Sequence, residues 1–285
     1  HYYGNNDYGA QFDNVLIQED VTASGAELNN CTINKSGGNI ILNDVISIDG
    51  SITFSSGDLD ASSNNLVLTS AATVSGGSDA SHVIGAMVKT TTATSKFTFP
   101  VGDGTQYKAI SITPENGTST EWSAKYFNTA YSSTTLGGNA ADIDHVSTYE
   151  YWDLDRTGSD AAKVEIPWVP LNEVEVYADL RLAHWDSGAS AWENIASDAV
   201  GSNSSGNLTS QGFQNSFSPF TLGSSSSTNV LPIELVSFSG EKRNNRNILN
   251  WTTASEINNA FFTVEKSYNG IDFEWVGTQE GTSPS

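Results

Sequence analysis

Apolar residues recur at every second position between about residues 39 and 74. Residues i and i+2 of an extended strand point to the same face, so this period indicates short strands with one buried face. Residues that tolerate tight turns separate the apolar pairs, among them Asn43-Asp44, Asp49-Gly50 and Ser56-Gly57. The pairs are Ile40/Leu42, Ile46/Ile48, Ile52/Phe54 and Leu66/Leu68.

Two folds account for this alternation. In the first, three short faces make one coil of about 20 residues, and successive coils stack as a β-solenoid. In the second, the strands form an antiparallel meander with Asp49-Gly50 as a hairpin turn. We expect a solenoid-like region over residues 1–95 and keep the meander as the alternative.

Longer strands with aromatic residues follow between Lys96 and Gly223, separated by polar loops. No segment in this range has the 3.6-residue period of an amphipathic helix. An all-β chain with many strands and no helix predicts a β-sandwich, which we place at residues 96–223. The predicted strands are Phe97–Val101, Lys108–Thr113, Glu121–Asn128, Thr148–Arg156, Lys163–Trp168, Leu180–Trp185, Trp192–Ala196, Asn207–Thr209 and Phe217–Leu222.

A run of serines ends the sandwich and predicts a flexible linker at residues 224–228. A third β unit follows over residues 229–285, where Leu231, Ile233, Leu235 and Phe238 are apolar anchors for a first strand. The strands predicted in this unit are Ile233–Ser239, Asn247–Trp251, Phe261–Ser267 and Phe273–Thr278.

The net charge of the chain limits the classes of partner that it can bind. With 12 basic and 33 acidic residues, the formal net charge is −21. Nucleic acids and anionic membranes bind cationic surfaces, so we expect neither partner. An acidic surface instead favours solubility and offers carboxylates to divalent cations. The single cysteine, Cys31, excludes an intrachain disulfide and a multi-cysteine metal site.

The sequence also bears on location. No stretch approaches the roughly 18 apolar residues of a membrane span, so we expect no membrane insertion. The chain begins at His1 without an initiator Met or a signal peptide, and we expect a processed or partial chain. Abundant Ser, Thr, Asn and Gly beside few Lys and Met is typical of secreted bacterial β-proteins.

The histidines do not indicate an enzyme. Nucleophilic hydrolysis needs a histidine beside an activated serine and an acidic group, and no G-x-S-x-G phrase is present. The H-x-x-x-H and H-E-x-x-H spacings of zinc sites are also absent. We predict no catalytic activity and interpret His184 as a half-exposed strand residue. The four histidines are His1, His82, His145 and His184.

Two pairs of aspartates are the candidate metal ligands. Asp142 with Asp144, and Asp153 with Asp155, each alternate along the chain, so each pair shares one strand face about 7 Å apart. Such pairs suit a Ca²⁺ ion, the acid and base of glycoside hydrolysis, or a solvated outer face. We expect the solvated face, with Ca²⁺ as the one candidate cofactor and catalysis as the least favoured reading.

The aromatic residues are compatible with glycan binding. The chain has 7 tryptophans and 10 tyrosines, and flat aromatic faces can stack on sugar rings. Trp152, Trp185 and Trp192 alternate with apolar or small residues in predicted strands, which favours core packing instead. The first residues, HYYGNNDYG, lack aliphatic side chains, so we expect them to pack against the first coil or a neighbour.

Six phrases, read in order, resemble secreted and cell-surface proteins of the Bacteroidota that are exported by type IX secretion. They are ATVSGGSDASHVIGAMVKT, KFTFPVGDGTQYKAISITP, YEYWDLDR, LRLAHWD, FSPFTLGS and LPIELVSFSG. The segment from Leu231 resembles the start of a fibronectin type III-like module, which in such proteins commonly precedes a C-terminal sorting domain that these 285 residues do not include. The resemblance implies an extracellular, cell-surface or secreted location and a role in display or adhesion, and it implies no reaction.

A fibronectin-like sandwich needs about seven strands, and the third unit offers only the four named above. Open sheet edges invite pairing with another chain. Three explanations stay open: the chain is cut, a neighbouring molecule supplies the missing strands, or a smaller sandwich is complete.

Two functions remain. The first is a non-catalytic extracellular structural or adhesive protein, acting as a surface stalk, spacer or filament subunit. The second is a carbohydrate-binding accessory region of a larger secreted enzyme. We favour the first, with other copies of the chain or other surface proteins as partners through edge strands or module completion, and with an extracellular glycan as a further partner.

Overall fold

The computed structural model describes residues 11–12, 15–17, 27–172, 174–217, 219–227, 229, 235–244, 246–253, 261–268 and 273–281. These residues form strands joined by loops, and the helices among them are two three-residue 3-10 turns, η1 (Pro170–Asn172) and η2 (Tyr177–Asp179). The all-β prediction is therefore confirmed. The N-terminal HYYGNNDYG segment and the anchors Leu231 and Ile233 lie outside the described residues.

The N-terminal region is solenoid-like, with parallel strands stacked coil on coil. Cys31 lies opposite Ile52, and Ile52 lies opposite Val74, so one coil takes about 20 residues. Asp49-Gly50 lies inside a strand, so the meander with a hairpin turn there is wrong. The stacked strands are β1 (Gln11–Phe12), β2 (Val15–Ile17), β3 (Glu27–Ile41), β4 (Ile46–Leu68), β5 (Thr73–Gly76) and β6 (Val83–Thr91).

Alternation of residue type produces the two faces of this stack. The inward side chains are apolar and buried, as at Ile33 and Ile52, both 0% exposed. The outward side chains are small and polar, and they bond from coil to coil. The hydroxyl of Ser51 donates to Oδ1 of Asn30 over 2.7 Å. In this parallel register, apolar side chains therefore stack on one another inside the solenoid, and polar side chains form hydrogen bonds with one another on its outer surface.

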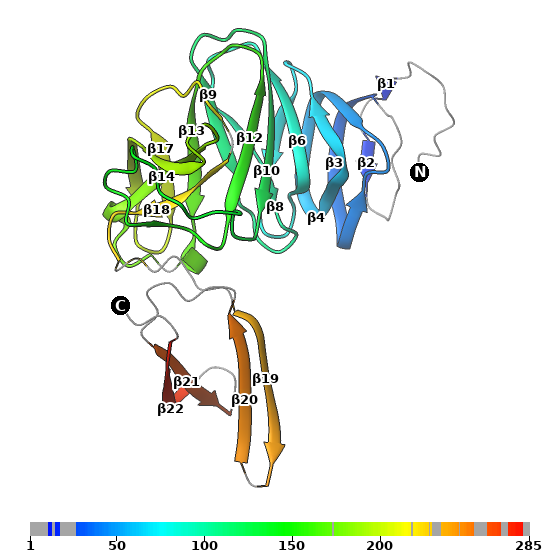
Figure 1. Ribbon diagram of the computed structural model, residues 1–285. Helices are drawn as coiled ribbons and strands as arrows, with labels where there is room; N and C mark the ends of the chain where they lie inside the picture. Colours follow the sequence, from blue (N-terminus) through cyan, green and yellow to red (C-terminus); the bar gives the residue numbers. More distant parts are fainter. Residues whose placement is uncertain are drawn as a thin grey trace.

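The solenoid and the sandwich share one sheet. Strand β6 pairs in parallel with β4 on one side and antiparallel with β10 on the other. The 13-stranded sheet runs along the path β1-β3-β4-β6-β10-β12-β18-β14-β15, and Figure 1 shows it continuing from the blue coils into the green strands. The strands not yet given are β8 (Val101–Gly102), β10 (Thr120–Phe127), β11 (His145–Val146), β12 (Tyr151–Thr157), β14 (Leu180–Asp186), β15 (Ala191–Ile195) and β18 (Phe220–Ser224).

A second sheet packs on the sandwich part of the first. Its five strands follow the order β16-β17-β13-β9-β7. One hydrophobic cluster joins the two sheets and reaches from Leu28 in the solenoid to Leu222 in β18, so the core crosses the predicted boundary at residues 95 and 96. The five strands are β7 (Phe97–Phe99), β9 (Ile110–Pro114), β13 (Ala162–Trp168), β16 (Ser197–Gly201) and β17 (Gly206–Ser210).

Eight of the nine strands predicted for the sandwich are present as single strands, with ends shifted by a few residues. The predicted strand Phe97–Val101 is instead divided into β7 and β8, which pair in different sheets. Strands β11 and β16 were not predicted, because each is short and lacks an alternating apolar pattern. Trp122, Trp152 and Trp168 fill the space between the sheets, each at most 1% exposed. Bulky rings facing inward from both sheets explain why two layers close without a helix.

The last four strands form two separate hairpins, which Figure 1 draws apart from the larger sheets. All four predicted strands of this unit are present. Phe238 and Trp275 remain 60% and 66% exposed. The hairpin strands are β19 (Leu235–Arg243) with β20 (Arg246–Thr253), and β21 (Phe261–Ser267) with β22 (Phe273–Glu280). A search of the described residues finds no helix with the length and apolar content of a membrane span.

Candidate functional site

The first aspartate pair lies on the loop before β11, so the prediction that Asp142 and Asp144 share one strand face is wrong. Asp142 and Asp144 are exposed on either side of the buried Ile143, and Asp142 has a left-handed backbone with φ of 66°. Oδ2 of Asp144 lies 3.0 Å from Nδ1 of His145. These two carboxylates therefore face solvent beside one histidine.

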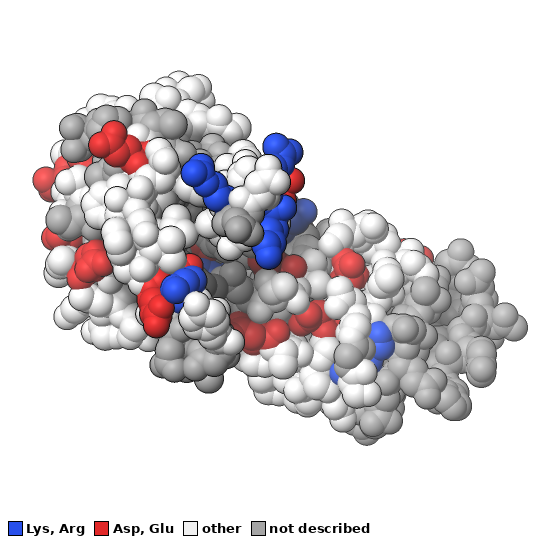
Figure 2. Space-filling model, turned by 90° about the horizontal axis from the view of Figure 1, so that it is seen from below, with Lys and Arg blue, Asp and Glu red and all other residues white. Residues whose placement is uncertain are grey.

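The second pair lies on β12, with the alternation that the sequence predicts. Trp152 and Leu154 are 0% exposed, so Asp153 and Asp155 take the outer face of the strand. Asp153 lies opposite Lys125 of β10. Among the described residues, no group of three or more His, Cys, Asp or Glu side chains could hold a metal ion. Figure 2 shows acidic side chains scattered over the face seen from below. The Ca²⁺ site stays a prediction.

His82 is a buried structural residue. The backbone N–H of Gly104 donates to its Nε2 over 2.9 Å, so the ring proton lies on Nδ1, which donates to the carbonyl of Ser78 at 3.0 Å. Its backbone N–H donates to Oδ1 of Asp58. His82 thus joins a solenoid coil to the loop after β8 through both of its ring nitrogens.

The prediction of a half-exposed His184 is wrong, because this residue is only 6% exposed. It faces the same side as Leu182, toward the core, and its ring lies 4.9 Å from that of Phe220. Strand β14 pairs with β18 on one side and with β15 on the other, and His184 lies opposite Phe220 and Glu193 on those strands. Burial lowers the pKa of His184 despite a backbone hydrogen bond and the nearby carboxylates of Asp186 and Glu193.

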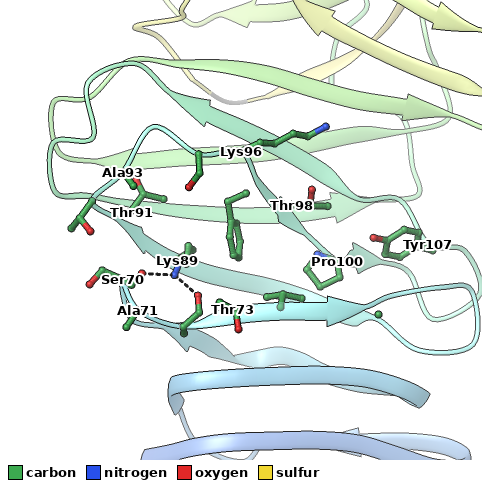
Figure 3. A pocket seen from close by; sticks show the side chains of 16 residues that line it. Ser70, Ala71, Thr73, Lys89, Thr91, Ala93, Lys96, Thr98, Pro100 and Tyr107 are labelled. Carbon is green, nitrogen blue, oxygen red and sulfur yellow. Dashed lines mark hydrogen bonds between the residues drawn. The ribbon is translucent and has the colours of Figure 1, made fainter.

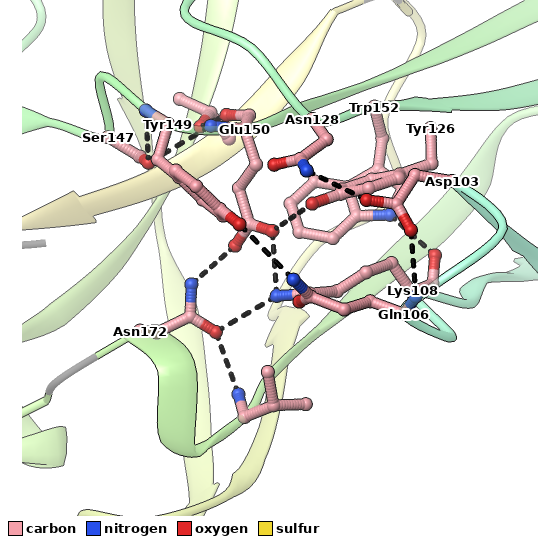
Figure 4. Close-up of polar contacts among 12 residues, drawn as sticks. Asp103, Gln106, Lys108, Tyr126, Asn128, Ser147, Tyr149, Glu150, Trp152 and Asn172 are labelled. Atoms are coloured by element: carbon pink, nitrogen blue, oxygen red, sulfur yellow. Dashed lines mark hydrogen bonds and ion pairs between the residues drawn. The ribbon is translucent and has the colours of Figure 1, made fainter. Parts of the chain in front are cut away.

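A polar cluster lies buried in the sandwich (Figure 4). Nζ of Lys108 lies 2.7 Å from Oε2 of Glu150, and both side chains are 0% exposed. The hydroxyl of Tyr126 donates to the same carboxylate oxygen over 2.8 Å. The amide of Asn172 donates to Oε1 of Glu150 over 2.6 Å and accepts from Lys108 over 3.1 Å.

The geometry of this polar cluster indicates a structural role. Each charged group has an oppositely charged partner and additional hydrogen bonds, which is what a buried ion pair needs to offset desolvation. Tyr126 has a raised pKa because of burial and the adjacent Glu150 carboxylate, so it stays a neutral donor. No surface opening reaches Lys108 or Glu150, whose exposure is zero. Sequence reasoning missed the pair because the two residues are far apart in the sequence and precede strands of different sheets, β9 and β12.

The loop GDG after β8 closes beside this cluster. Oδ1 of Asp103 accepts from the backbone N–H groups of Thr105 and Gln106, and Oδ2 accepts from the amide of Asn128 over 2.7 Å. Burial alone would raise the pKa of Asp103, but these hydrogen bonds outweigh it and lower the pKa. Asp103 therefore stays charged and holds the turn in place.

An open cleft of about 410 Å³, here called the junction cleft, lies where the solenoid meets the sandwich (Figure 3). It lies between the solenoid corner at Ser70–Gly76 and the segment Thr91–Thr98, where the sandwich begins. Among the described residues that line it, none is Asp or Glu. Phe97 and Tyr107 contribute rings, and six further residues carry hydroxyls: Ser70, Thr73, Thr91, Thr92, Ser95 and Thr98.

Lys89 forms the inner wall of the junction cleft. Its ammonium donates to the backbone carbonyls of Thr69, Ser70 and Ala72 at 2.5, 3.1 and 2.6 Å. It also lies 5.2 Å from the centre of the Phe97 ring. Burial lowers the pKa of Lys89 to about 8. The ammonium thus joins the backbone of the solenoid corner through hydrogen bonds to carbonyl groups and not through an ion pair with a carboxylate.

Lys96 lies at the rim of the same cleft. Its Nζ lies 2.6 Å from Oε1 of Glu165 on β13, and its side chain is 48% exposed. An ammonium has three N–H donors, so this ion pair leaves donor capacity toward solvent. Lys96 is therefore the cationic group of the cleft that an incoming molecule can reach.

The tryptophans named in the sequence pack as predicted. Trp152 and Trp192 are 0% exposed, and Trp185 is half-buried at 5.5 Å from the Trp192 ring. On the outer face of the sheet, the rings of Phe127 and Tyr151 stack on each other at 4.5 Å and 8°. These faces cover one another, so this surface offers little flat aromatic area to a sugar.

Comparison with known proteins gives no match to a family model, to a curated protein or to a solved structure.

Proposed function

We propose that this chain is a non-catalytic extracellular protein with a structural or adhesive role, as a surface stalk, spacer or filament subunit. One observation carries the proposal: a single sheet and a single core run from the solenoid strands through the sandwich. A body whose two parts share one sheet and one core suits a stalk or spacer that transmits load. The six phrases that resemble type IX-exported surface proteins support an extracellular location.

The use of the buried polar groups also supports a structural role. His82, Lys89 and the Lys108–Glu150 pair each connect different parts of the fold through satisfied hydrogen bonds. A catalytic group instead needs a substrate within hydrogen-bond reach. We propose on this basis that the chain is not an enzyme.

Electron microscopy and light scattering of the purified chain test this proposal. We expect elongated particles that associate into longer assemblies as the concentration rises. Compact monomers at every concentration, together with turnover of a panel of chromogenic glycosides, would contradict it.

The terminal hairpins are the proposed points of assembly. Each of β19 to β22 pairs with only one described strand, and Trp275 and Val276 on β22 are more than half exposed. Another copy, or another surface protein, can add a strand at such an edge. We expect Trp275→Lys to abolish assembly, whereas Lys242→Gln in the other hairpin leaves it intact.

The second candidate function is carbohydrate binding, and the junction cleft favours it. A volume of about 410 Å³ lies within the roughly 300–1,000 Å³ range of small-molecule sites. Hydroxyl side chains beside two rings suit a ligand with many hydroxyl groups. A glycan array tests this candidate: a set of bound glycans with a common terminal unit supports it, and an empty array contradicts it.

A further inference from the structure

We infer that the junction cleft binds a saccharide that carries a carboxylate, with Lys96 as the residue that contacts the carboxylate. This inference rests on the second candidate function and names its ligand class. It follows from the distribution of charge around the cleft, the donors available there and the size of the space.

The local charge of the cleft is opposite to that of the chain. The whole chain has a formal net charge of −21, yet the described residues lining this cleft include two lysines and no carboxylate. On a chain with this net charge, a cationic opening is a favourable place for a carboxylated ligand to approach. A ligand that carries a carboxylate therefore gains an electrostatic attraction that its neutral analogue lacks.

Lys89 contributes positive charge to the cleft but does not contact the ligand. Its hydrogen bonds go to carbonyls of the solenoid corner, and no described carboxylate lies within ion-pair distance of its ammonium. Carbonyl dipoles leave its net charge in place. Lys89 therefore gives the inner wall a positive potential, while its geometry is determined by the fold.

Lys96 supplies the direct contact. Its ammonium holds one partner, Glu165, and is half exposed at the rim. A ligand carboxylate can share this ammonium through a charge-assisted hydrogen bond. The exposed hydroxyls of Thr92 and Ser95 border the same opening and can bond to the sugar hydroxyls.

Two substitutions at the Lys96–Glu165 pair provide a sharp test, because both break the same ion pair. Lys96→Gln removes the contact, and we expect binding to weaken about fivefold, as for a partly exposed charge pair. Glu165→Gln frees the ammonium from its present partner, and we expect tighter binding. Lys163→Gln, on the same strand as Glu165 and outside the cleft, is the matched control and should change nothing.

The probes are trigalacturonate and its carboxyl-reduced trisaccharide, titrated calorimetrically into the full chain. We expect the first to bind more tightly than the second. Ala93→Trp, on the exposed rim, should block both by filling the opening. Melting temperatures of all variants establish that each is folded, and Glu165→Gln keeps the test informative if Lys96→Gln unfolds.

The outcomes distinguish recognition of a carboxylate from carbohydrate binding in general. Equal binding of the two trisaccharides, blocked by Ala93→Trp, would overturn the carboxylate inference and leave carbohydrate binding standing. Binding of neither probe would overturn the inference, and an empty glycan array besides would remove the second candidate function. Equal weakening by Lys96→Gln and Glu165→Gln would also overturn the inference, because it would reflect loss of the ion pair alone.

Discussion

Lys108 and Glu150 form an ion pair of 2.7 Å with both side chains completely buried between the sheets. Lys108 precedes β9 of the second sheet, and Glu150 precedes β12 of the first. The pair therefore links the two layers of the sandwich. Asn172, from η1, bonds to both partners and completes their hydrogen bonding.

Removing one member of this pair should be costly. We expect Lys108→Met to lower the free energy of unfolding by about 3–5 kcal/mol, because it leaves an uncompensated buried charge. The double variant Lys108→Met/Glu150→Gln should lose less than the sum of the single variants. Urea denaturation of the four proteins measures this coupling. Additive losses would show that the charges do not interact.

A matched control for that experiment is the exposed pair of Lys96 and Glu165. Lys96→Met should cost about 1 kcal/mol or less, since solvent screens a half-exposed charge. A loss as large as that of Lys108→Met would mean that burial does not explain the difference.

Gly76 should not tolerate a side chain. Its φ is +81°, and a Cβ atom there would lie 2.0 Å from the carbonyl oxygen of Phe54 on the neighbouring coil. We expect Gly76→Ala to lower the free energy of unfolding by at least about 2 kcal/mol. Gly212→Ala is the control, because nothing lies within 4 Å of a Cβ at that position. Thermal melting of both variants decides whether coil spacing depends on this glycine.

Lys89 should matter to the solenoid corner. Lys89→Met keeps the apolar stem and removes the donor to three carbonyls, so we expect a loss of about 1–3 kcal/mol. Lys163→Met, on β13, should lie within about 0.5 kcal/mol of the parent. Hydrogen exchange of residues 69–74 should rise in the first variant alone. An unchanged rate of hydrogen exchange at these residues would contradict the proposal that Lys89 stabilises the solenoid corner.

Acidification should act through His184. Burial holds its pKa below the usual 6.5, so between the folded and unfolded pKa values the unfolded chain binds more protons. The contribution of this residue to stability is therefore complete above the unfolded value and falls as the pH drops through it. Melting temperatures from pH 8 to pH 5 should fall less in His184→Gln than in the parent. Equal slopes would show that His184 is not the responsible group.

Calcium should have little effect if the aspartate pairs are a solvated face. We expect the melting temperature to be the same with CaCl₂ and with EDTA. A rise with CaCl₂ that disappears in Asp153→Asn/Asp155→Asn would instead establish a site on β12. The same result with Asp142→Asn/Asp144→Asn would place it on the loop before β11.

The local pattern of the chain determined most of the strands. Alternation at Ile52/Phe54 and around Trp152 predicts which side chains face inward, because the period of a strand depends on neighbouring residues alone. The coil length followed from the spacing of such pairs. The outward position of Asp153 and Asp155 followed for the same reason.

Only the tertiary structure decided which strands are neighbours. It joined β6 to both β4 and β10, and so made one sheet of two predicted regions. It brought Lys108 to Glu150, enclosed His184, and placed Lys89 and Lys96 around one cleft. These features depend on contacts between residues far apart in sequence, which local periodicity does not encode. The sequence alone therefore determined which side chains of each strand point inward. The packing of the strands determined which charged groups are buried and where the cleft lies.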